Sequence, residues 1–91
     1  MTKIEIVREI ASKTGLSTKY VMLVIESLMD TIKTSMGNGE EVFLRGFGSF
    51  IIKHRAEKTA RNISQNITVI VPAHDIPAFK PAKEFMDKLK G

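Results

Sequence analysis

EVFLRGFGSFIIKHRAEKTARNISQN, residues 41–66, is the most informative segment of this 91-residue chain. Its first part, Glu41 to Arg45, is rich in strand-forming residues, turns at Gly46-Phe47-Gly48, and returns as Ser49 to Lys53. Beyond Lys53 the segment becomes basic and loses the residue pattern of a core. The sequence therefore predicts two paired strands whose outer end continues beyond the body of the domain.

A third strand is predicted at Thr68 to Val71, where β-branched residues run together until Pro72. The connection between the second and third predicted strands, residues 54–67, is long for a hairpin loop. We expect this connection to extend both strands outward as a two-stranded ribbon, which we call the arm. A leg of about seven residues, at about 3.3 Å per residue, reaches roughly 20–25 Å.

Positive charge is concentrated in the arm and at the C-terminal end of the chain. Of the net charge of +4, residues 1–44 contribute −1, residues 45–61 contribute +4, residues 62–79 contribute −1 and residues 80–91 contribute +2. Solubility alone does not require such segregation, and a localised basic surface is typical of proteins that bind a polyanion. The basic residues of the middle segment are Arg45, Lys53, Arg55, Lys58 and Arg61.

The arm carries an arginine, a small amide and an apolar residue in succession, Arg61-Asn62-Ile63. Cations on two adjacent strands can straddle a groove and hold phosphates, and an apolar side chain can wedge between stacked base pairs from the minor groove. An exposed β-branched residue at a loop tip has no evident use in solution, which argues against a plain solvated loop. The pattern predicts a DNA-binding arm.

The first part of the chain predicts two helices. Thr2 and Glu5 fit a capping box, Gly15 ends the first helix with a left-handed residue, and Ser17 caps the second. The shorter first helix cannot cover the long apolar stripe of the second, so we expect a second chain to cover it. That stripe consists of Val21, Val24, Ile25, Leu28, Met29, Ile32 and Met36.

A final short helix, Ala82 to Leu89, is predicted to begin at Pro81. Lys80 and Lys83 lie near its N-terminus, where cations do not favour the helix dipole but where anions bind. A phosphate partner explains that placement. The predicted fold is α+β in a single domain, residues 1–91. It has a helical dimerisation part at 1–37, a three-stranded antiparallel sheet at 40–76 with the arm at about 54–67, and a C-terminal helix at 81–90.

Several classes of function are disfavoured by the composition. The chain has no cysteine, and His54 and His74 are isolated from other metal-ligating residues, so we expect no disulfide, metal or cofactor. No nucleophilic triad, paired carboxylates or glycine-rich phosphate loop is present, so an enzyme with a small-molecule substrate is not expected. The N-terminus is charged throughout, and no uncharged apolar run approaches about 18 residues, which predicts an intracellular protein with no membrane span.

Four motifs occur in order along the chain: Arg45-Gly-Phe-Gly-Ser-Phe50, Arg61-Asn62, Pro72-Ala73 and Ile76-Pro-Ala-Phe-Lys-Pro81. With them the chain resembles the bacterial HU / integration host factor family of histone-like, DNA-bending proteins. The resemblance covers nearly the whole chain. It implies an intertwined homodimer or heterodimer with a helical base and two arms that enter the minor groove of double-stranded DNA. It also implies a cytoplasmic protein of the bacterial nucleoid that bends or condenses DNA with low sequence specificity.

The resemblance also implies roles for particular residues. Arg55, Lys58 and Arg61 would be arm cations, Ile63 the inserting tip, and Lys80 and Lys83 phosphate clamps on the body. Arg45 would approach the minor groove, and Lys3 is a weaker candidate. The expected DNA-binding residues are Lys3, Arg45, Lys53, Arg55, Lys58, Arg61, Asn62, Ile63, Lys80 and Lys83.

The tip departs from the family pattern, which is usually Asn-Pro followed by a Thr-Gly turn. Here the tip is Asn62-Ile63-Ser64-Gln65-Asn66. Isoleucine can act as a wedge but lacks the rigidity of proline, and Asn66 has to take the left-handed geometry that glycine adopts without strain. The bend angle is therefore not set by the resemblance.

Two other readings remain open from the residues alone. Helix, glycine-containing turn and helix is the outline of a helix-turn-helix regulator, with Ser17, Thr18, Lys19 and Tyr20 facing bases. Alternatively, the arms could pair with a partner's sheet in a protein–protein scaffold. The sequence also leaves open whether the second subunit is identical, whether a specific DNA site exists, and whether RNA binds.

Overall fold

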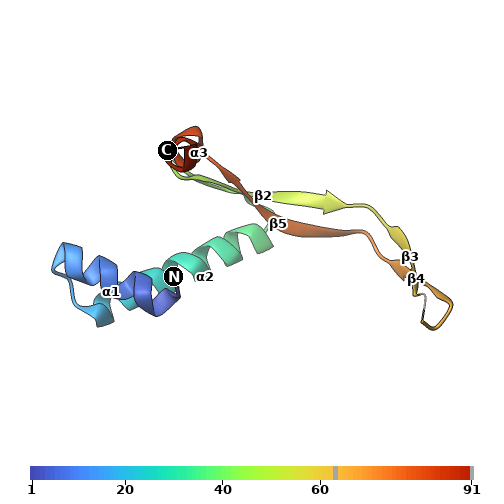
Figure 1. Cartoon of the computed structure of the whole chain (residues 1–91), viewed down its shortest axis with the longest axis horizontal. Coiled ribbons are helices and arrows are strands. Elements are labelled where there is room, and N and C mark those ends of the chain that lie inside the picture. Colours follow the sequence, from blue (N-terminus) through green and yellow to red (C-terminus); the bar gives the residue numbers. More distant parts are fainter. Residues whose placement is uncertain (63, 91) are drawn as a thin grey trace.

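The computed structural model describes residues 1–62 and 64–90 (Figure 1). Helices α1 (Lys3–Thr14) and α2 (Thr18–Gly37) form an antiparallel hairpin on one side of the molecule. Strands β1 (Val42–Leu44), β2 (Gly48–Arg55) and β5 (His74–Pro81) form an antiparallel sheet in the order β1-β2-β5. Strands β3 (Lys58–Asn62) and β4 (Ile67–Val71) pair separately, and α3 (Lys83–Lys90) ends the described chain.

The helix ends form where the local sequence signals place them. The Thr2 hydroxyl oxygen accepts a bond from the Glu5 N–H at 3.3 Å, and its O–H donates to the Glu5 carboxylate at 3.2 Å. Gly15 is left-handed, with φ of 78°, and its N–H donates to the Ala11 carbonyl at 2.9 Å. Ser17 Oγ accepts from the Tyr20 N–H at 3.1 Å. These contacts confirm the predicted caps.

The arm is confirmed as a continuation of the sheet, and Thr68 to Val71 is a strand as predicted, but it is not the third strand of the sheet. Thr68 to Val71 lies in β4, the returning leg of the arm, and pairs with β3. The third strand of the sheet is β5, which contains Pro77 opposite Ile52 and runs on to Pro81. Proline is tolerated there because β5 is an edge strand, where a missing N–H need not break a ladder bond.

In the Gly46-Phe47-Gly48 turn, Gly46 is required by its left-handed backbone and Gly48 by close packing. Gly46 has φ of 80°, and a Cβ there would lie 2.8 Å from Glu84 Oε2. A Cβ on Gly48 would lie 2.5 Å from a ring carbon of Phe79 and 2.7 Å from the Lys80 carbonyl oxygen. The close approach lets β2 pack against β5 beneath an aromatic cluster whose ring centroids are 5.1–5.9 Å apart. The cluster consists of Phe47, Phe50, Phe79 and Phe85.

The core of a single chain is small. Among the described residues, the buried hydrophobic side chains are Val7, Ala11 and Val21. The radius of gyration is 18.7 Å, whereas a compact chain of this length has a radius of about 12 Å. The apolar face of α2 remains exposed, with Leu28 44% accessible. A single chain therefore buries too little apolar surface for a stable fold of this size. No helix in the described part of the chain is long and apolar enough to cross a bilayer.

Candidate nucleic-acid interface

Two successive strand pairs, β2–β5 and then β3–β4, extend away from α1 and α2 (Figure 1), and exposed cations lie along both pairs. Lys53 lies opposite Ile76 and Arg55 opposite His74 in the β2–β5 pair. Lys58 lies opposite Val71 and Arg61 opposite Thr68 in the β3–β4 pair. All four cations are exposed. Because strand residues alternate between faces, Lys53 and Arg55 share one face, as the sequence predicted.

Three aliphatic residues of β4 project to one face of the outer ribbon, which we call the aliphatic face although Lys58 and Asn62 share it; the sequence did not predict this grouping. Residues directly opposite each other in an antiparallel pair project to the same face. Lys58, Ala60 and Asn62 on β3 therefore share a face with their partners on β4. Those partners, Val71, Val69 and Ile67, are 37–48% exposed. The alternation in Ile67 to Val71 is visible in the sequence, but it is equally typical of a strand in the body of the domain, where such residues are buried.

The arm changes direction where its two ribbon segments meet. Ala56-Glu57 on one leg and Pro72-Ala73 on the other lie between the paired strands. Just inside this junction, His54 Nδ1 and Asp75 Oδ1 are 2.8 Å apart across β2 and β5. A hollow of about 530 Å³ opens at the junction, and Arg55 and Lys58 are among the residues that line it. Glu57 also lines this hollow, so the root of the arm carries two cations and one carboxylate there.

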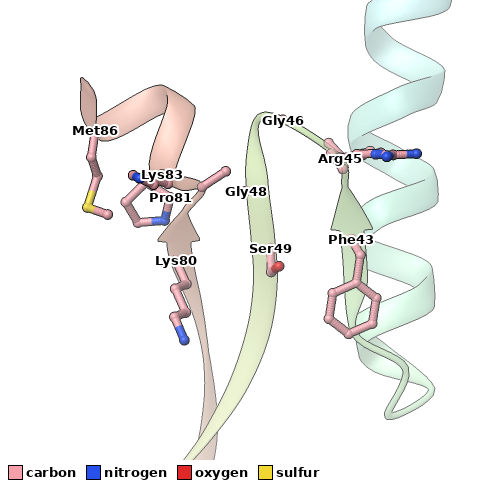
Figure 2. Close-up of a pocket in the computed structure, with 11 residues that line it drawn as sticks. Phe43, Arg45, Gly46, Gly48, Ser49, Lys80, Pro81, Lys83 and Met86 are labelled. Atoms are coloured by element: carbon pink, nitrogen blue, oxygen red, sulfur yellow. The ribbon is translucent and has the colours of Figure 1, made fainter. Parts of the chain in front are cut away.

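A second basic surface lies on the body, around a hollow of about 520 Å³. Arg45, which follows β1, Lys80 on β5 and Lys83 at the start of α3 all line it (Figure 2). The pairing of Ser49 with Lys80 brings these distant segments together. Figure 2 shows the three charged ends pointing in different directions. Among the lining residues none is acidic. Cations spread in this way fit an extended polyanion better than a single small ion.

Lys3 is not brought together with the other expected site residues. It lies in the first turn of α1, and its ammonium group pairs with Glu26 of α2 at 2.5 Å. The hydrogen bond and charge of Lys3 hold the pKa of the Glu26 carboxyl below its usual range. In this structure Lys3 therefore ties the two helices of the base together.

Side-chain hydrogen bonds form on either side of residue 63. Asn62 Oδ1 accepts bonds from the Ser64 N–H at 3.1 Å, the Ser64 hydroxyl at 2.7 Å and the Gln65 N–H at 3.4 Å. Asn66 has φ of 53°, which confirms the expected left-handed geometry. Its Oδ1 accepts a hydrogen bond from an Nη2 of Arg61. The proposed inserting residue, Ile63, lies outside the described residues.

The residues described do not build a metal centre, since no group of three or more histidine, cysteine, aspartate or glutamate side chains comes together in 1–62 and 64–90. What the arrangement offers is a projecting basic ribbon with one aliphatic face, a basic body surface and a helical base that lacks a cover. Together these features define a nucleic-acid-binding protein that uses a β-ribbon.

The chain belongs to the bacterial DNA-binding protein family, whose model matches residues 1–90. Members of this family are architectural proteins and not enzymes. Family membership confirms the resemblance drawn from the sequence motifs, and it disfavours a helix-turn-helix regulator and a protein–protein scaffold.

Individual relatives and solved structures agree with this assignment. Integration host factor subunit beta of Marinobacter nauticus is 43% identical over 90 residues, which cover 98% of this chain and 92% of that protein. DNA-binding protein HU of Thermotoga maritima is 33% identical, covering 99% of this chain and all of that protein. An Anabaena HU–DNA cocrystal structure matches with a TM-score of 0.93 at 34% identity, covering 98% of this chain and 97% of that chain.

Proposed function

We propose that this protein works as a dimer that binds double-stranded DNA through both arms and bends it with low sequence specificity. The observation that carries the proposal is the projecting β3–β4 ribbon, which combines exposed cations with an exposed aliphatic face. While they face water, the exposed aliphatic side chains of this ribbon contribute little to the stability of the fold. The ribbon fits the minor groove, where phosphates line both rims and sugars form apolar walls.

On the arm, Arg55, Lys58 and Arg61 would neutralise phosphates and release their counterions, which supplies affinity without sequence information. The aliphatic face at Ile67 and Val69 would lie against the sugar walls of the groove. The minor groove presents a degenerate pattern of donors and acceptors, so low sequence preference follows from this mode of binding.

On the body, Arg45, Lys80 and Lys83 would hold the flanking duplex once it bends back toward the base. Their positions around one hollow support a shared partner, and the spread of their charged ends suits successive phosphates. Lys53 lies on the inner ribbon between this surface and the arm cations, and would continue the basic path. Lys3 would join only by leaving Glu26 or by bridging to it.

An apolar wedge can add a sharp kink to the bending that cations promote. Ile63, which the sequence places beside Asn62, would enter between base pairs from the minor groove. Unstacking one step costs about a few kcal/mol, which is offset by the additional body contacts that a bent duplex permits. Binding energy from these contacts would thus stabilise the bent form of the duplex.

The dimer would form over the base. The exposed apolar side chains of α2 include Val24, Leu28 and Met29. A hollow of about 430 Å³ between the end of α2 and the sheet is lined mainly by apolar residues such as Met36 and Ile52. A second chain, either identical or related, would bury both of these apolar surfaces. We place the assembled dimer in the cytoplasm, on the bacterial nucleoid.

The proposal is tested by fluorescence anisotropy of a labelled duplex of about 35 base pairs, titrated with protein at several salt concentrations. We expect binding that weakens steeply as salt rises, and similar affinity for duplexes of unrelated sequence. A flat salt response, or binding of only one sequence, would contradict the proposal. A complex of defined size that forms with another protein in the absence of DNA would favour a scaffold.

A further inference from the structure

Asn66 contributes two separate properties to the tip. Its backbone is left-handed, with φ of 53°, which places it among the few non-glycine residues that adopt this conformation readily. Its side-chain carbonyl oxygen accepts a hydrogen bond from Arg61 Nη2. Glycine would provide the first property and not the second. The asparagine therefore links the turn to a cation on the opposite leg of the ribbon.

The bond to Asn66 does not consume the binding capacity of Arg61. A guanidinium group has five N–H donors, and a phosphate needs only two of them. Arg61 is exposed, so without a partner its long side chain would sample many rotamers in free protein. A bond that restricts it before DNA arrives reduces the rotamer freedom that binding removes.

Asn62 reinforces this arrangement from the other side of the tip. Its Oδ1 accepts from the N–H groups of Ser64 and Gln65 and from the Ser64 hydroxyl. An asparagine thus lies at each end of the tip, and the two side chains accept hydrogen bonds from different groups. Asn62 orders the backbone of the turn, and Asn66 holds the arginine.

We propose that Asn66 is a positioning residue, which orients the Arg61 guanidinium for phosphate binding before the arm meets DNA. The inference rests on the proposed function, because it assumes that Arg61 contacts the duplex. It assigns a role to a residue outside the set of expected DNA contacts. In this protein, part of the preorganisation of the tip comes from a side-chain bond.

The test compares Asn66→Gly, Arg61→Ala and the double variant with the wild-type protein in the duplex anisotropy assay. Asn66→Gly is compatible with the left-handed backbone and removes the side-chain acceptor. We expect it to weaken binding about two- to tenfold for each arm, the cost of immobilising one long side chain, and so roughly five- to hundredfold for a dimer with two arms. The slope of log affinity against log salt should stay unchanged, because the arginine charge remains. Arg61→Ala should lower that slope by about 2 for the two subunits of a dimer.

The double variant decides whether Asn66 acts through Arg61. We expect it to bind no more weakly than Arg61→Ala alone. Ser64→Ala is the matched control, since it removes a tip hydrogen bond that does not involve Arg61, and it should weaken binding less than Asn66→Gly. In the free protein, NMR relaxation of the Arg61 Nε–H group should show greater mobility in Asn66→Gly than in the wild type.

Two results would overturn the inference while leaving the proposed function intact. One is wild-type affinity and unchanged Arg61 mobility in Asn66→Gly. The other is an Asn66→Gly effect that persists in full in the Arg61→Ala background. Absence of salt-dependent binding by the wild-type protein would instead refute the proposed function, and with it the assumption on which the inference rests.

Discussion

Removing the two lysines of the body surface, Lys80→Ala with Lys83→Ala, should weaken DNA binding by an amount that depends on salt. Both lysines are exposed and line the same hollow, yet they lie on different elements. Lys80 is held by the pairing of β5 with β2, and Lys83 opens α3. Neither forms an ion pair within the described residues, so the substitutions remove charge without breaking such a contact.

The size of the effect follows from the number of phosphates released. Each neutralised phosphate contributes about 0.9 to the slope of log affinity against log salt. Two lysines in each of two subunits correspond to four phosphates, so the slope should fall by about 3.6. Between roughly 50 and 200 mM salt, wild-type protein should then lose on the order of 100-fold more affinity than the variant.

The assay is duplex anisotropy over this salt range, with Lys88→Ala and Lys90→Ala as a matched control. The control removes the same charge from the last turn of the same helix, at residues that do not line the hollow. It should leave the slope nearly unchanged. Equal slopes for wild type and the Lys80/Lys83 variant, or equal losses in both double variants, would refute the assignment of the body surface.

Three further predictions concern the fold and the tip. Gly48→Ala should destabilise the protein by about 1–3 kcal/mol in urea unfolding, because the new Cβ would meet Phe79 at 2.5 Å, whereas Gly37→Ala, with nothing within 4 Å, should not destabilise it. Glu26 has a lowered pKa, so its ion pair stabilises the fold above its ordinary value of 4.5 and is lost as pH falls through the lowered value. Glu26→Gln should remove the part of the loss of stability at acid pH that comes from this ion pair. An unchanged pH profile of unfolding in the variant would contradict the role of the ion pair. Ile63→Ala should reduce bending more than affinity, and equal bending by both proteins would show that residue 63 is not a wedge.

The elements that depend on nearby residues were predictable from the sequence. The helix boundaries followed from Thr2, Gly15 and Ser17, because each cap satisfies backbone groups within three or four residues. The left-handed backbone of Asn66 was likewise predictable, since few residues adopt that conformation. These are local decisions of the chain.

The elements that depend on sheet position were not predictable in the same way. Pro77 looks like a break until β5 is known to lie at the sheet edge. Thr68 to Val71 looks like a body strand until its pairing with the basic strand β3 is known. The prediction that the chain forms a three-stranded sheet with an arm was therefore right, while the residues of the third strand were wrong.

The residues of the candidate site also divide into those that the sequence predicts and those that depend on strand pairing. The arm cations were evident from the segregation of charge along the sequence. The placement of Arg45, Lys80 and Lys83 around one hollow depends instead on the pairing of β2 with β5. The Arg61–Asn66 bond crosses the tip and has no signature in composition. Lys3 shows the converse, because a cation expected to bind DNA is already paired with Glu26.

The most direct test of the central claim is the end-to-end distance of a duplex bound by the protein. A duplex of about 35 base pairs, labelled at both ends, reports this distance by fluorescence energy transfer, because a bend draws the ends together. We predict that transfer rises as protein is added and that the rise is lost at high salt. Saturated binding with no change in transfer would contradict the account, since it would mean that the arms hold DNA without bending it.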